Sequence, residues 1–151
     1  MTKKERAREL FSEGYNCAQS VAGAFCEEVG LPLEVCVRLT SGFGGGMGRL
    51  REVCGACTGM FFVLSAVGGY DDAADTEGKK KLYEDVRAAA DAFRAKNGSI
   101  VCRELLGGAP AGGAPEKRTE SYYKKRPCAD LVGDAAEILE QLLQQKRGGD
   151  Q

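Results

Sequence analysis

The 151-residue sequence predicts an all-α protein, a single-domain helical bundle of about six or seven helices with one buried central helix. Apolar residues recur every three or four positions along most of the chain, and no stretch alternates apolar with polar residues as a half-buried strand does. One apolar segment, residues 53–69, carries no charged side chain and is the expected central helix. A chain of this length buries its own core, so residues 1–151 are expected to form one cysteine-rich helical domain.

Helix boundaries in the first 40 residues follow from residue types that begin or end helices. Ser, Thr, Asn and Asp cap helix starts with a side-chain oxygen, glycine ends helices in a left-handed conformation, and proline suits a first turn. On this basis we expect three helices, with these boundary residues: Thr2 and Gly14 for the first, Asn16 and Gly30 for the second, and Pro32 before a third over 33–39.

The central segment follows a glycine-rich stretch, residues 42–48. This stretch fits neither GxxxxGK[ST] nor GxGxxG, so we interpret it as a flexible loop that lets the backbone pack closely around Cys54 rather than as a phosphate site. Residues 53–70 are uncharged and just long enough to span a membrane, but their four glycines favour a core helix. Gly55 and Gly59 would let a neighbouring helix backbone approach closely.

The second half of the chain continues the helical pattern without an internal repeat. The glycine- and proline-rich residues 107–115 read as a loop that is too short to separate domains. We expect four helices in this half: Asp75 or Thr76 to Asn97 with Gly98 as its stop, 100–106 capped by Ser99, a short polar helix within 116–125, and a last helix that starts at Pro127.

Composition limits the function classes. The formal net charge of −1 gives no basic field for nucleic acid or an anionic membrane, so neither is an expected partner. The sequence contains no histidine, which excludes Ser-His and Cys-His nucleophiles and His-ligated haem or zinc. The charged N-terminal stretch has no apolar signal region, so a cytoplasmic location is expected. Thiols are kept reduced there, and seven cysteines then indicate metal binding or redox chemistry.

Four cysteines are each predicted at a helix start, where unpaired N–H groups and the helix dipole favour a thiolate: Cys17, Cys54, Cys102 and Cys128. Four convergent thiolates can hold an iron-sulfur cluster or a zinc ion. Structural zinc sites usually take close CxxC pairs, and the chain has one, formed by Cys54 and Cys57, so an iron-sulfur cluster or reversible thiol-disulfide chemistry is favoured. Cys26 and Cys36 lie in apolar stripes and are expected to be small buried residues.

The chain resembles the family named "putative redox-active protein" for its C_GCAxxG_C_C cysteine pattern. The resemblance rests on GYNCAQ at 14–19, GFGGGMGR at 42–49, CGACTG at 54–59, and the two later cysteines. It implies that Cys17, Cys54, Cys102 and Cys128 are the family's cysteines and that the activity is redox in class. The third motif here reads Cys-Gly-Ala, and Cys57 is additional to the pattern. A similar module accompanies haem in split-Soret cytochromes, but no haem-attachment motif is present.

Three functional hypotheses follow. The leading one is a redox protein with an iron-sulfur cluster, favoured over zinc, on the four cysteines, acting in electron transfer or redox sensing with an electron-transfer protein as partner. The second is a thiol-disulfide oxidoreductase in which Cys54 attacks and Cys57, or a more distant cysteine, resolves. The third is a non-redox binding module stapled by zinc, with apolar helices forming a homo-oligomer interface.

Overall fold

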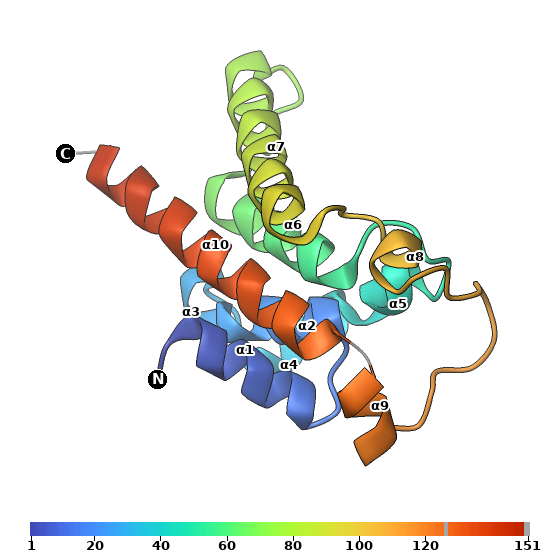
Figure 1. The fold of residues 1–151 in the computed structure, drawn as a ribbon. Coiled ribbons are helices and arrows are strands. Elements are labelled where there is room, and N and C mark those ends of the chain that lie inside the picture. Colours follow the sequence, from blue (N-terminus) through green and yellow to red (C-terminus); the bar gives the residue numbers. More distant parts are fainter. Residues whose placement is uncertain (126, 150–151) are drawn as a thin grey trace.

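The computed structural model describes residues 1–125 and 127–149, and within them the fold is all-α apart from one isolated β-bridge (Figure 1). The all-α prediction is therefore confirmed. The longer helices are α1 (Lys3–Ser12), α2 (Cys17–Ala24), α4 (Leu33–Leu39), α6 (Gly55–Gly68), α7 (Thr76–Asn97) and α10 (Cys128–Gly149). The shorter ones are α3 (Cys26–Val29), the 3-10 turn η1 (Ser41–Phe43), α5 (Gly44–Met47), α8 (Cys102–Leu105) and α9 (Glu120–Lys125).

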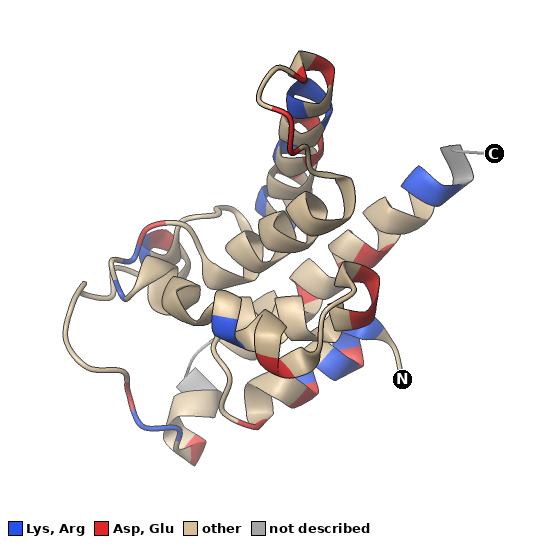
Figure 2. Ribbon diagram, turned by 180° about the vertical axis from the view of Figure 1, so that it is seen from behind, with Lys and Arg blue, Asp and Glu red and all other residues tan. Residues whose placement is uncertain are grey.

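The central helix is α6, which packs against α2, α7 and α10, while α1 lies along α10 (Figure 1). Figure 2 shows that α6 carries no charged residue, whereas α7 carries both signs. The core that this arrangement encloses is filled by large, fully buried side chains, among them Phe11, Phe25, Met60, Phe93 and Leu139. Among the described helices, none combines the length and apolarity needed to cross a membrane.

Two glycines of α6 set its distance from α2. A Cβ atom on Gly59 would lie 2.9 Å from the carbonyl oxygen of Ala18, and one on Gly55 would lie 3.1 Å from the Ala18 nitrogen. Both distances are shorter than ordinary contacts, so only glycine allows the two helices to pack this closely. The expectation of a close helix approach at these positions is confirmed, and the approaching helix is α2.

The second predicted helix differs from the structure. It was expected to run unbroken to Gly30, but Phe25 adopts φ −110° and ψ 20°, which interrupts the helix and separates α2 from α3. The Phe25 side chain is 1 % exposed. The break therefore coincides with burial of a large aromatic ring. Such burial depends on tertiary packing, which the helical periodicity of the sequence does not predict.

The helix predicted over 100–106 is shorter, because Val101 forms an antiparallel β-bridge with Val53. Ser99 was expected to cap this helix, and its hydroxyl instead accepts a hydrogen bond from the Val101 N–H at 2.9 Å, before the helix begins. The bridge keeps Val101 extended, so α8 begins at Cys102. This places Cys102, like Cys17, at the first position of its helix.

Candidate functional site

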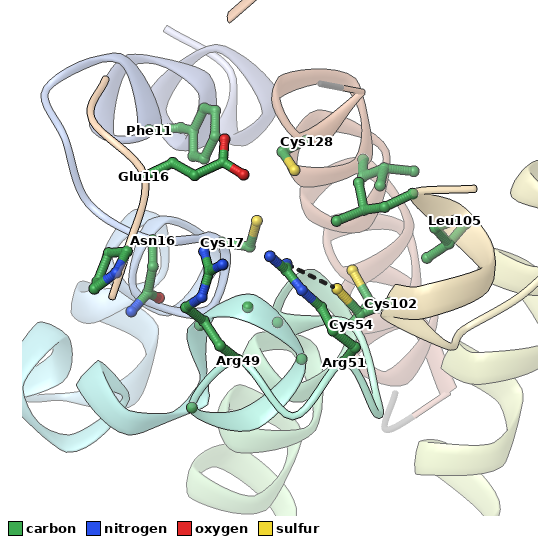
Figure 3. A pocket seen from close by; sticks show the side chains of 18 of the residues that line it. Phe11, Asn16, Cys17, Arg49, Arg51, Cys54, Cys102, Leu105, Glu116 and Cys128 are labelled. Atoms are coloured by element: carbon green, nitrogen blue, oxygen red, sulfur yellow. Dashed lines mark hydrogen bonds between the residues drawn. The ribbon is translucent and has the colours of Figure 1, made fainter. Parts of the chain in front are cut away.

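The four cysteines predicted to act together all line one cavity of about 310 Å³ (Figure 3). Each lies at the start of a different helix: Cys17 is the first residue of α2, Cys54 is the N-cap of α6, Cys102 is the first residue of α8 and Cys128 is the first residue of α10. The other three cysteines, Cys26, Cys36 and Cys57, do not line this cavity.

Asn16 positions Cys17 by capping α2. Its side-chain oxygen accepts from the Gln19 N–H at 2.9 Å, and the Gln19 side chain accepts from the Asn16 N–H at 3.0 Å. The Asn16 amide also donates to the carbonyl oxygen of Ser41 at 3.0 Å, which fixes α2 to the turn that follows α4. Asn16, which the sequence predicted as a cap, therefore starts helix α2 and also joins two walls of the cavity.

The β-bridge places Cys54 and Cys102 together. On either side of the Val53–Val101 pair, the Cys54 N–H donates to the Ile100 carbonyl at 2.7 Å and the Cys102 N–H donates to the Glu52 carbonyl at 2.6 Å. Each of the two bridged segments continues into a helix, α6 or α8, immediately after the bridge. The side chains of Cys54 and Cys102 therefore enter the cavity side by side (Figure 3).

The glycine-rich stretch is a defined left-handed turn rather than a flexible loop. Five consecutive residues, 45–49, have φ between 59° and 70°, and Arg51 follows with φ 60°. Glycine adopts this conformation freely, whereas Met47, Arg49 and Arg51 are each strained by about 1–2 kcal/mol. A Cβ atom on Gly46 would lie 2.6 Å from the Cβ of Cys102. The predicted close packing of this stretch is thus present, and it is made against Cys102.

Three arginines face the thiols. Figure 3 shows Arg49 and Arg51 pointing into the cavity. Arg51 is only 4 % exposed, and its guanidinium donates to the Cys102 sulfur at 3.6 Å and to the Pro110 carbonyl at 3.2 Å. The pKa of Cys17 is raised by its hydrogen bond to Cys128 and by burial, and Arg118 lies close enough to oppose part of this rise. The cavity therefore combines thiols with guanidinium groups and with the carboxylate of Glu116.

Arg118 was missed by the sequence reasoning. Its guanidinium stacks over the Phe11 ring at 4.3 Å and donates to the carbonyl oxygens of Phe11 at 3.0 Å and Tyr15 at 2.9 Å. These contacts hold the segment before α9 against the end of α1. The sequence around Arg118 does not predict this role, because the two carbonyl groups that it binds lie more than 100 residues away, although its guanidinium also contacts the nearby rings of Tyr122 and Tyr123.

The four thiols do not ionise alike. The pKa of Cys54 is lowered because the Cys57 thiol and the N–H groups of Ala56 and Cys57 donate hydrogen bonds to its sulfur, which outweighs burial. The pKa of Cys17 is raised because its thiol hydrogen-bonds to Cys128 and is buried. Burial also raises the pKa of Cys102, against the opposing effect of Arg51. The expectation that every helix start favours a thiolate is therefore wrong for Cys17 and Cys102, where hydrogen bonding and burial exceed the dipole effect.

The thiols are not arranged around a single ion. Among the described residues, no three histidine, cysteine, aspartate or glutamate side chains are grouped closely enough to hold one metal ion. The four cysteines share a cavity, but the side chains do not form a preassembled single-ion site.

Fold and site together define a cysteine-rich all-α protein with an arginine-flanked cavity that is lined by thiols. The chain belongs to the family described as "Putative redox-active protein (C_GCAxxG_C_C)", whose profile matches residues 15–142. It is also similar to a protein of Archaeoglobus fulgidus named "Uncharacterized protein", with 29 % identity over 151 residues that cover 95 % of each chain. No solved structure matches the chain.

Proposed function

We propose that this protein binds a redox metal centre through Cys17, Cys54, Cys102 and Cys128, an iron-sulfur cluster in preference to zinc, and acts in electron transfer or redox sensing. One observation carries the proposal: thiols from four separate helix starts line a single cavity. Iron-sulfur clusters are held by four cysteine thiolates, and a bound cluster would supply one-electron redox chemistry.

The donor set suits such a centre. The cavity offers four thiols, the carboxylate of Glu116 and no histidine, and the flanking Arg51 and Arg118 would offset the negative charge of four thiolates. A zinc ion requires all its sulfurs about 2.3 Å from one point. Among the described residues, no three cysteine, histidine, aspartate or glutamate side chains are grouped that closely. Because the pKa values of Cys17 and Cys102 are raised, loading would release protons and strengthen as pH rises.

Anaerobic purification tests the proposal directly. The sample is assayed for visible absorption, iron, acid-labile sulfide and zinc. Iron and sulfide in matching amounts, with a broad visible band that dithionite bleaches, are expected. Zinc without iron would favour the zinc-stabilised binding module. A colourless, metal-free protein with a reversible two-electron thiol couple would favour the thiol-disulfide oxidoreductase instead.

Single substitutions test the ligand set. Cys17→Ser and Cys128→Ser should each lower metal content and absorbance several-fold, because each removes one of four ligands. Cys26→Ser is the matched control, since Cys26 is half-buried like Cys17 but lies outside the cavity. Metal content unchanged in both ligand variants would show the four-ligand assignment to be wrong.

A further inference from the structure

We propose that Cys54 and Cys57 are a site of reversible oxidative modification, at which a hydroperoxide converts the two thiols into a disulfide. The disulfide would remove Cys54 from the four cavity thiols and so release a metal centre held by them. That consequence rests on the proposed function. The modification itself does not, because it requires only the two thiols.

Geometry singles out this pair. Both residues lie in the first turn of the 14-residue helix α6, where the Cys57 N–H donates to the Cys54 carbonyl at 2.9 Å. Cys54 is the N-cap of α6 and Cys57 lies three residues further along the same turn, a spacing that brings side chains together on one helix face, so the two thiols are neighbours. A disulfide between them would therefore need no movement of one helix relative to another.

The two thiols differ in their access to a small oxidant. Cys54 lines the cavity, whose other walls include the solvent-exposed residues Gly42, Gly113 and Pro115. Cys57 is fully buried and does not line the cavity. A hydroperoxide entering the cavity would consequently meet Cys54 first, with Cys57 held directly behind it.

The chemistry balances in two steps. The Cys54 thiol attacks the hydroperoxide ROOH, the O–O bond breaks, and the products are a Cys54 sulfenic acid and the alcohol ROH. The Cys57 thiol then condenses with the sulfenic acid, forming the S–S bond and releasing water. Two thiols lose two electrons in total, and one peroxide gains them. A dithiol reductant restores both thiols by exchange.

A rival pair exists in the same cavity. The Cys17 thiol hydrogen-bonds to Cys128, so these sulfurs are also neighbours, but they lie on α2 and α10. The two products are distinguishable by trypsin digestion. Cys54 and Cys57 share the uncleaved fragment 52–79, in which a disulfide removes two hydrogens, whereas a Cys17–Cys128 bond would join two separate fragments.

The test uses the full-length, metal-free, reduced protein treated with one equivalent of hydrogen peroxide, followed by thiol alkylation and peptide mass spectrometry. We expect the disulfide within fragment 52–79 to be the main product and to disappear on treatment with dithiothreitol. A Cys17–Cys128 product, or alkylation of both Cys54 and Cys57 after oxidation, would overturn the proposal. This arm needs no variant, so it holds even if a substituted protein fails to fold.

Matched variants sharpen the result. In Cys57→Ser the disulfide should be lost and Cys54 should accumulate as a sulfenic acid that dimedone traps. Cys36→Ser is the control, because Cys36 is as fully buried as Cys57 but lies on α4, and it should leave the product unchanged. A metal-loaded sample should lose its metal as the disulfide forms. If no metal is ever bound, the proposed function fails while the oxidation result still decides this inference.

Discussion

Arg51 is a buried cation with a strained backbone, and its side chain contacts one of the cavity thiols. It is 4 % exposed, has φ 60°, and directs its guanidinium at the Cys102 sulfur. Left-handed backbone and a buried cation both cost free energy, and such strain persists only where the surroundings enforce it. The adjoining left-handed turn and the Pro110 carbonyl supply that enforcement. The arrangement places a fixed positive charge beside a thiol whose pKa is raised by burial, and the charge opposes part of that rise.

Replacing Arg51 by Gln should raise the pKa of Cys102 further, because the cation that favours its thiolate is removed while burial remains. The measurement is the pH dependence of Cys102 alkylation in metal-free protein, followed by peptide mass spectrometry, and the curve should move to higher pH. Arg51→Lys keeps the charge and should move the curve less. An Arg51→Gln profile that overlays the wild-type profile would contradict the assigned role of this guanidinium.

Sequence reasoning at the residue scale placed Cys17 and Cys128 at helix starts from local features, whereas the positions of Cys54 and Cys102 also depend on the bridge between Val53 and Val101. Asn16 caps α2 and Pro127 precedes α10, and both signals are read within a few residues of the thiol. The unequal pKa values were not predictable in this way. They depend on pairings such as Cys17 with Cys128, which exist only once distant helices have packed.

At the scale of elements, the packing of α6 on α2 depends on small residues. Gly59→Ala should lower the free energy of unfolding by about 1–3 kcal/mol, because the added methyl group overlaps the Ala18 carbonyl and the Val21 side chain. Denaturant unfolding measures this change. Gly68→Ala in the same helix is the control, since its Cβ would meet only the flexible end of Lys146, and its effect should be smaller or slightly stabilising. Equal losses in both variants would rule out helix approach as the cause.

Arg118 joins the segment before α9 to the end of α1, through the rings of Phe11, Tyr122 and Tyr123. Arg118→Met should therefore loosen this segment while leaving the helical core intact. Amide exchange should increase at least several-fold over residues 113–123, and the circular dichroism spectrum should change little. Arg103→Met, on exposed α8, is the control and should leave exchange in that segment unchanged.

Element boundaries were predictable where side-chain caps define them and not where tertiary contacts do. Asp75 caps α7 and Gly98 ends it in a left-handed conformation, as expected. The break at Phe25 and the late start of α8 follow from burial and from a β-bridge between residues 48 positions apart. The left-handed turn at 45–49 was read as a flexible loop, because glycine permits that conformation without requiring it.

For the whole molecule, the buried thiols make stability depend on pH. The pKa values of Cys17, Cys36, Cys57 and Cys102 are raised in the folded state above the ordinary value of 9.0. Their contribution to the free energy of unfolding is fully present below pH 9.0 and is lost as the pH rises above it. The reason is that the unfolded chain then releases protons that the folded chain retains. Cys54 acts in the opposite direction, because its pKa is lowered. Four thiols with a raised pKa against one with a lowered pKa leave a net loss of stability in alkaline solution.

Metal-free reduced protein should accordingly lose on the order of 1 kcal/mol or more of unfolding free energy per pH unit above pH 9, since one titrating group contributes up to about 1.4 kcal/mol per unit. Urea unfolding at several pH values measures this slope. Cys17→Ala removes one thiol with a raised pKa and should make this slope smaller. A slope that is zero in the wild-type protein would contradict the burial of neutral thiols.

The four cavity thiols also come from distant parts of the chain, with Cys17 on the second helix and Cys128 on the last. During synthesis on a ribosome, the first three thiols emerge well before the fourth. The face of α1 that packs on α10 stays uncovered until α10 has been made. A nascent chain that has not yet released α10 therefore exposes both an incomplete set of cavity thiols and an apolar face of α1. The cavity is complete only once α10 has been made and has packed on α1 and α2.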